Sequence, residues 1–146
     1  MNALHQSKRR GLLGILAALA LSLAGCSNMP YGGGVHVMLS GDQEVPAVMT
    51  SASGSGTIMI NADKSVSGSV TTTGVAGTMA HIHMAASGKN GPVIVPLTKS
   101  GEGTWSVPAG AMLTDAQYQA YKAGELYVNV HSAANKGGEI RGQLKP

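Results

Sequence analysis

The sequence predicts an all-β fold, an antiparallel β-sandwich of Greek-key type with about eight strands and one short helix. Phenylalanine is absent and glycine accounts for 21 of the 146 residues. The core must therefore be built from small aliphatic and β-branched side chains, which favour strands. Short runs of alternating apolar and polar residues recur between turn-forming segments, with no repeat of fixed period. Only one segment carries the capping signals of a helix.

The domain is predicted at residues 35–146, behind a leader at 1–25 and a tether at 26–34. The leader has a basic start at residues 8–10 and an apolar run from Gly11 to Leu23. This run is short for a membrane-spanning helix, which needs ~20 apolar residues. We therefore predict a cleaved export signal, with an uncleaved membrane anchor as the alternative.

The positive charge of the chain belongs to this leader. The whole sequence has a net charge of +3, but three of its ten basic residues lie at positions 8–10. Cleavage leaves seven basic against seven acidic residues. No basic patch indicates a nucleic-acid partner.

The first half of the domain alternates with a period of two. A strand is predicted at 35–39, and the polar segment 40–48 with its proline is predicted to be a loop or a sheet edge. Asp42 and Glu44 in this loop are interpreted as solvated acids, with part of a cation site as the alternative. Strands at 53–60 and 65–73 flank a turn at 61–64, which predicts a hairpin.

The second half contains the remaining strands and the helix. Strands are predicted at 79–83, 93–97, 104–107, 126–131 and 139–144. Turns are predicted at 85–92, 99–103 and 132–138. Thr114 and Gln117 form a capping box for a helix at 115–123, which Gly124 ends. The only tryptophan, Trp105, is predicted to pack inside the sandwich.

Three histidines are predicted to share one surface. If Ile82 points into the core, His81 and His83 point outward together, and the same parity turns His131 outward when Val130 points inward. The three rings meet only if their two strands are neighbours, a condition that spacing does not establish.

These side chains suit a transition metal. His81 and His83 lie ~7 Å apart along one strand, and His131 is the candidate third ligand. Imidazole suits copper, zinc and nickel, and the thioethers of Met79 and Met84 favour copper(I). The sequence thus predicts a metal site, with copper as the leading ion.

The alternative is that the histidines only brace the sheet through hydrogen bonds to Asn129, Glu139 or a backbone carbonyl. Beside a metal, Asn129 would instead orient a ligating ring. Glu139 and Arg141 share a face and are predicted to pair with each other or with a cross-strand neighbour, with ligand binding as the alternative. His36 is expected to be plain surface.

The leader resembles that of bacterial lipoproteins. Cys26, the only cysteine, follows Leu23-Ala24-Gly25 as in a lipobox. This resemblance implies that Cys26 is lipidated, becomes the mature N-terminus and anchors the protein in a membrane. Ser27 lacks the aspartate that often retains lipoproteins at the inner membrane, which favours the outer membrane of a two-membrane envelope.

Several short motifs are spread over the predicted domain: Leu39 to Pro46 (LSGDQEVP), Ala80 to His83 (AHIH), Asn90 to Val93 (NGPV), Leu126 to His131 (LYVNVH) and Gly137 to Leu144 (GGEIRGQL). With these motifs the domain resembles the CHRD family, first named in chordin. It implies an extracytoplasmic β-sandwich. Ala47 stands where the family often has a second proline, and methionines flank the His-x-His pair where small residues are commoner.

The leading functional hypothesis is a non-enzymatic, lipid-anchored binding module of the cell envelope with no catalytic residues. No cysteine nucleophile, Gly-x-Ser-x-Gly motif or phosphate loop indicates a hydrolase. The rival is a structural domain or one that binds an envelope protein. A metal-dependent redox enzyme ranks last, because superoxide dismutases of similar fold use more histidines than the four that remain after cleavage.

Overall fold

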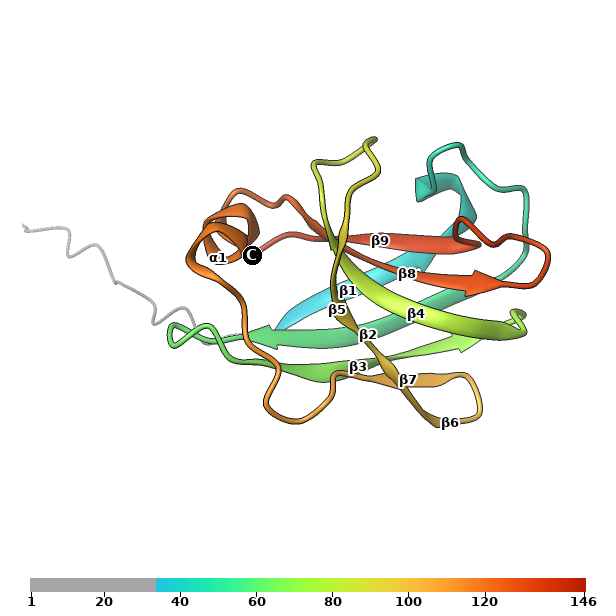
Figure 1. Ribbon diagram of the computed structural model, residues 1–146. Coiled ribbons are helices and arrows are strands. Elements are labelled where there is room, and N and C mark those ends of the chain that lie inside the picture. The colour runs from blue at the N-terminus through green and yellow to red at the C-terminus, as the bar shows by residue number, and fades with distance from the viewer. Residues whose placement is uncertain (1–33) are drawn as a thin grey trace, which may run out of the picture.

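The computed structural model describes residues 34–146, so the predicted leader, the lipobox and Cys26 lie outside the described residues. Nine strands, one 3-10 turn and one α-helix follow one another (Figure 1). They are β1 (Val35–Ser40), η1 (Gly41–Gln43), β2 (Ser53–Ile60), β3 (Val66–Thr73), β4 (Gly77–Met84), β5 (Val93–Pro96), β6 (Thr98–Gly101), β7 (Thr104–Ser106), α1 (Asp115–Lys122), β8 (Leu126–Ser132) and β9 (Ile140–Leu144).

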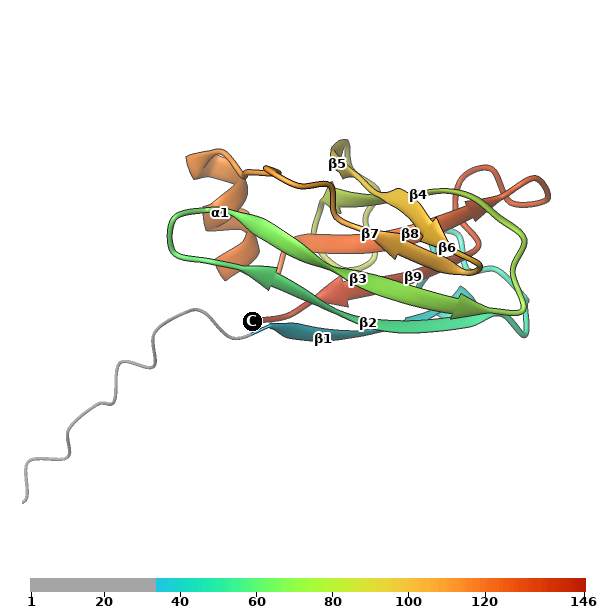
Figure 2. The same cartoon turned by 90° about the horizontal axis from the view of Figure 1, so that it is seen from below.

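All strands belong to one antiparallel sheet in the order β5-β4-β8-β9-β1-β2-β3-β7-β6. The sheet folds over on itself, so that its two halves enclose the core (Figure 2). On one side the halves join where Ser40 of β1 pairs with Arg141 of β9. On the other side the chain passes directly from β5 to β6 through Leu97, whose amide donates to the carbonyl of Ala80 (2.9 Å). The predicted antiparallel β-sandwich is therefore confirmed, as a nearly closed sheet.

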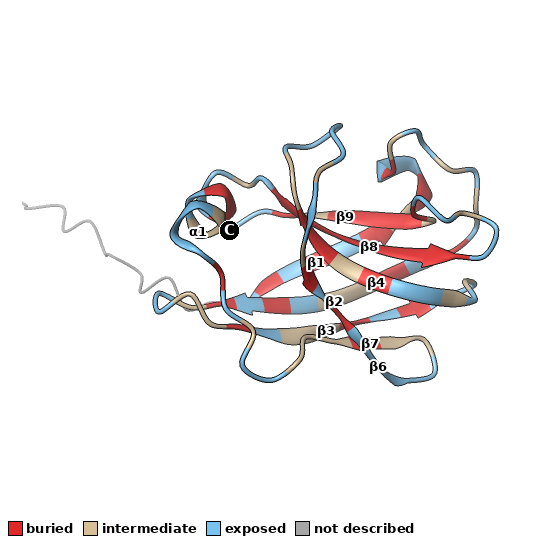
Figure 3. Ribbon diagram, viewed as in Figure 1, coloured by how far each residue is buried: buried red, intermediate tan, exposed pale blue. Residues whose placement is uncertain are grey.

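The core uses the alternation seen in the sequence. On β1, Val37 and Leu39 are buried, whereas His36 and Met38 between them are exposed. The strands of the opposite half contribute side chains such as Ile82 and Val130, both fully buried. In the middle of the molecule β8 is buried along its whole length (Figure 3). The β8 side chains that point away from the core are therefore buried as well, because loops cover that face of the strand.

Helix α1 lies at one end of the sandwich, next to the C-terminus (Figure 1). Its predicted capping box is present, since the Thr114 hydroxyl accepts from the Gln117 amide (3.2 Å) and the Gln117 side chain accepts from the Thr114 amide (2.8 Å). Within residues 34–146, no helix is both long and apolar enough to cross a membrane.

One strand departs from the prediction. The sequence predicts a turn at 99–103, but residues 98–101 form β6, which pairs with β7 at the sheet edge. All four residues of β6 are exposed, so no buried face imposes a period-two pattern on them. The pairing of Lys99 with Trp105 holds this strand, and such a pairing leaves no local signal.

Candidate metal centre

The histidine strands are neighbours, which meets the condition that spacing left open. β4 pairs with β8 in antiparallel register, with His81 opposite Asn129, His83 opposite Tyr127 and Met79 opposite His131. On the other face, Ile82 and Val130 are fully buried in the core. Core packing therefore fixes the outward direction of all three histidines.

The three rings converge closely. One ligand nitrogen from each of His81, His83 and His131 lies within 4.8 Å of the other two. Nδ1 of His81 is 3.0 Å from Nε2 of His131. His83 and His131 are buried, and His81 is partly exposed, which leaves an approach to the cluster from solvent. Three converging imidazoles match the donor set of zinc, copper and nickel sites.

Backbone carbonyls fix the orientation of two of the rings. Nδ1 of His83 lies 2.9 Å from the carbonyl oxygen of Gly91, and Nδ1 of His131 lies 2.9 Å from that of Lys136. A carbonyl oxygen only accepts, so each Nδ1 carries a proton, and in the neutral form of the ring each Nε2 presents a lone pair. Nε2 of His83 is buried without a hydrogen-bond partner among the described residues. Metal-binding histidines are commonly held in this way.

Burial favours the neutral rings that a metal requires. Desolvation lowers the pKa of His81, and the charges of His131 and His83 lower it further. Desolvation also lowers the pKa of His83, although the hydrogen bond to Gly91 acts in the opposite direction. In both rings the lowered pKa favours the neutral form, which is the form that coordinates metal ions.

Stacked side chains support the cluster from β8 and β9. The His83 ring stacks on Tyr127, with ring centroids 4.8 Å apart and planes inclined by 6°. The Arg141 guanidinium lies 3.5 Å from the centroid of the Tyr127 ring. Arg141 is 1% exposed and donates to Asn90 Oδ1, Ala86 O and Gln143 Oε1. The stack of His83, Tyr127 and Arg141 thus connects the histidine cluster to the loop between β4 and β5.

The model of the CHRD domain matches residues 35–144, from the first residue of β1 to the last of β9. The chain belongs to the CHRD domain family. No curated protein and no solved structure gives a significant match. The family indicates an extracellular module.

The two methionines of the predicted site have different surroundings. Met79 is 51% exposed and lies opposite His131, on the histidine face of this CHRD domain. Met84 packs against the hydrophobic core instead. It is two residues beyond Ile82 and so shares the inward parity of that residue. The structure therefore does not place Met84 on the face of the three histidines, whereas His36 is exposed on β1 as expected.

The three residues predicted to support the site, Asn129, Glu139 and Arg141, make separate contacts. Glu139 and Arg141 do not pair with each other: Glu139 accepts from the Thr50 hydroxyl (2.9 Å), whereas Arg141 reaches the β4–β5 loop. Asn129 lies between Glu44 and His83, influences the pKa of both, and donates to Gly137 O (3.4 Å). The contacts of Glu139, Arg141 and Asn129 are made with residues in loops. The alternation of side chains along a strand does not determine where loops lie, so it did not predict these contacts.

Glu44 is the residue that sequence reasoning missed. Its interpretation as a solvated loop acid is wrong, because the side chain is buried at 6% exposure. Burial raises the pKa of this carboxyl to about 7, although the charge of Arg141 acts in the opposite direction. The η1 segment turns the chain so that Glu44 packs under the β8–β9 loop, next to Asn129 and Gly138. No local sequence signal marks this tertiary arrangement.

Proposed function

We propose that this CHRD domain is an extracytoplasmic, lipid-anchored module that binds one transition-metal ion through His81, His83 and His131. The observation that carries the proposal is the convergence of three ring nitrogens within 4.8 Å. The carbonyl contacts of His83 and His131 support it, because they direct both Nε2 lone pairs away from the backbone. The role is binding, without a catalytic step.

Copper is the ion that the side chains favour. Three imidazoles accept copper, zinc or nickel, whereas a thioether selects copper(I). Met79, exposed opposite His131 on the same face, offers such a thioether as an optional fourth ligand. An ion held by His81 and His131 would replace the hydrogen bond that now joins them.

The rival role is bracing. The hydrogen bonds of His83 to Gly91 and of His131 to Lys136 tie two loops to the sheet, and they would do so without a metal. In this case the domain would serve as a structural part of the envelope or bind an envelope protein. Metal affinity and folding stability separate the two roles, because bracing requires only the second.

Single substitution of His81, His83 or His131 by alanine should weaken copper binding at least tenfold, which corresponds to about 1.4 kcal/mol. Each substitution removes one of three converging ligands. Copper affinity is measured by competition with a chromophoric copper(I) chelator, using the full chain in neutral detergent. Calorimetry with zinc gives the affinity for a second metal for comparison. His36→Ala is the matched control, since His36 is an exposed strand histidine outside the cluster. Affinity should also fall as pH drops through the histidine range, ~6.5 and below.

The metal role is excluded if the wild-type chain binds copper no more tightly than the variant lacking all three histidines. Bracing then stands if that triple variant unfolds at a markedly lower denaturant concentration than the wild type. A triple variant with unchanged stability and lost metal affinity would instead support metal binding alone.

The lipid anchor is proposed from the sequence, because Cys26 lies outside the described residues. Cys26→Ser should abolish incorporation of labelled fatty acid and leave the leader uncleaved at this site. The measurement is metabolic labelling followed by membrane fractionation, with Ser27→Ala as a control that keeps the cysteine. A Cys26→Ser protein that is still lipidated would contradict the proposal. The serine at position 27 favours the outer membrane in a two-membrane envelope.

A further inference from the structure

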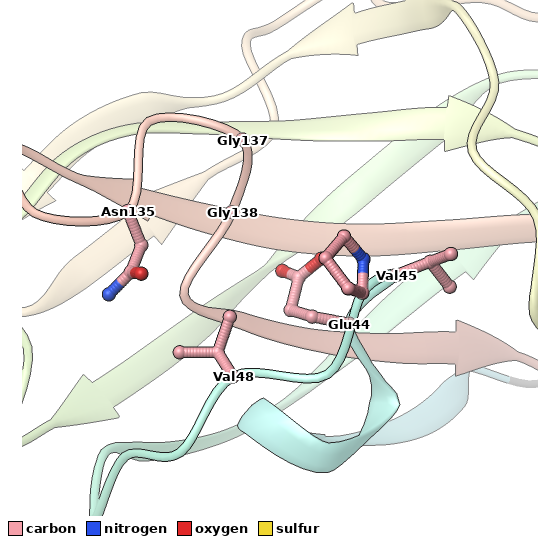
Figure 4. Close-up of a pocket in the computed structure, with 7 residues that line it drawn as sticks. Glu44, Val45, Val48, Asn135, Gly137 and Gly138 are labelled. Atoms are coloured by element: carbon pink, nitrogen blue, oxygen red, sulfur yellow. The ribbon is translucent and has the colours of Figure 1, made fainter.

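A cleft lies between the loop that follows η1 and the loop between β8 and β9 (Figure 4). Its volume is about 230 Å³. The lining consists of Glu44, Val45, Pro46, Val48, Asn135, Gly137 and Gly138. None of the three histidines lines it, so the cleft is a separate feature from the metal centre.

The carboxylate of Glu44 is incompletely satisfied in this cleft. The residue is 6% exposed, and its Oε1 atom has no hydrogen-bond partner among the described residues. Oε1 lies at the backbone of Gly138, where any Cβ would collide with it. A buried carboxylate oxygen without a donor is costly. Burial accordingly raises the pKa of Glu44 to about 7.

The nearest buried cation does not supply the missing donor. Arg141 acts on Glu44 only through its charge, since its guanidinium is stacked on Tyr127 and donates to Asn90, Ala86 and Gln143. Glu44 forms no ion pair in the described part of the chain. Hydrogen bonding from the Asn129 side chain and from the Val45 backbone also lowers the pKa of Glu44. Because Oε1 still has no partner at hydrogen-bonding geometry among the described residues, it can accept a further donor.

We propose that the cleft binds a primary ammonium group on a short aliphatic stem, carried by a small amine or by a lysine side chain of another protein. An ammonium has three donors and can form a charge-assisted hydrogen bond to the Glu44 oxygen. Val45, Pro46 and Val48 contribute apolar lining against which the aliphatic stem of the amine can pack. The volume of the cleft suits a short alkylammonium group, because sites for larger, drug-sized ligands are usually ~300–1,000 Å³.

The experiment is an amide NMR titration of the full isotope-labelled chain in neutral detergent. The probes are n-butylammonium chloride, uncharged n-butanol, a short peptide with one blocked lysine, and the same peptide with norleucine. Saturable shifts at Val48, Gly137 and Gly138 are expected for the ammonium probes. Glu44→Gln, which keeps the shape and removes the charge, should weaken them at least tenfold. Glu102→Gln, an exposed acid in the β6–β7 turn, is the matched control and should change nothing.

The outcomes separate the sources of the amine. Binding of butylammonium without the peptide supports a free amine, binding of the peptide alone supports a lysine of a partner protein, and binding of both supports an ammonium site open to either source. The proposal is overturned if neither probe gives saturable shifts, or if butanol or norleucine binds as tightly. The comparison with butanol uses the wild-type chain and so does not depend on the folding of a variant. Loss of the metal site by histidine substitution should leave amine binding in place, so the two proposals fail separately.

Discussion

Replacement of Trp105 by alanine is expected to lower the free energy of unfolding by about 3–5 kcal/mol. Trp105 is 3% exposed and belongs to the hydrophobic core. Its ring approaches the backbone of Gly77 so closely that a Cβ there would lie 2.9 Å from the indole. The chain has no phenylalanine and one tryptophan, and alanine leaves the space of the indole ring empty. Denaturant unfolding followed by far-ultraviolet circular dichroism measures the loss, because the variant lacks the fluorophore.

Trp105→Phe is the matched comparison. Its cost should be clearly smaller than that of Trp105→Ala, since the indole Nε1 has no hydrogen-bond partner among the described residues and its replacement breaks none. Met38→Ala, on the exposed face of β1, should change stability by about 0.5 kcal/mol or less. A loss below about 1 kcal/mol for Trp105→Ala would contradict the packing of this ring in the core.

The fold was predictable from the sequence where one strand face is buried. Val37 and Leu39 alternate with exposed neighbours, so the pattern of β1 is visible locally. Helix α1 was predictable because Thr114 and Gln117 cap it through short-range contacts. β6 was not, since it has no buried face and depends on pairing with β7. The closure of the sheet through Leu97 is likewise a long-range property.

The candidate site was predictable to the same extent. The alternation of side chains along a strand correctly predicted that His81, His83 and His131 share one face. The same alternation places Met84 on the opposite face, with Ile82, and so does not favour it as a ligand. The carbonyls of Gly91 and Lys136 that orient the rings come from loops, whose positions parity does not determine. Burial of Glu44 was missed for the same reason, because loops and not strands cover it.

Replacement of Arg141 by methionine is expected to lower the free energy of unfolding by about 3–5 kcal/mol when Glu44 is ionised. Arg141 is 1% exposed, and its removal deletes the contact with Tyr127 and three hydrogen bonds. It also deletes the charge that lowers the pKa of Glu44. Methionine keeps an unbranched apolar chain, so the cavity term is small. Denaturant unfolding at two pH values measures the effect.

The loss should grow with pH. Burial already raises the pKa of Glu44 from 4.5 to about 7, so the folded state holds this proton more tightly than the unfolded state does. Such a group reduces stability as pH rises from the unfolded towards the folded pKa. Without Arg141 the folded pKa rises further, and the reduction continues above pH ~7. The deficit of Arg141→Met should therefore be larger at about pH 8.5 than at about pH 5.5.

Glu44→Gln isolates this coupling, because glutamine has the same shape and does not titrate. In a double-mutant cycle, Arg141→Met on the Glu44→Gln background should lose its pH dependence and retain the deficit that comes from Tyr127 and the loop contacts. Arg141→Lys is the complementary control, since it keeps the charge and loses the planar contact with the ring. If the deficit of Arg141→Met is equal at both pH values, the charge of Arg141 does not act on Glu44, and only its packing stabilises this face of the sheet.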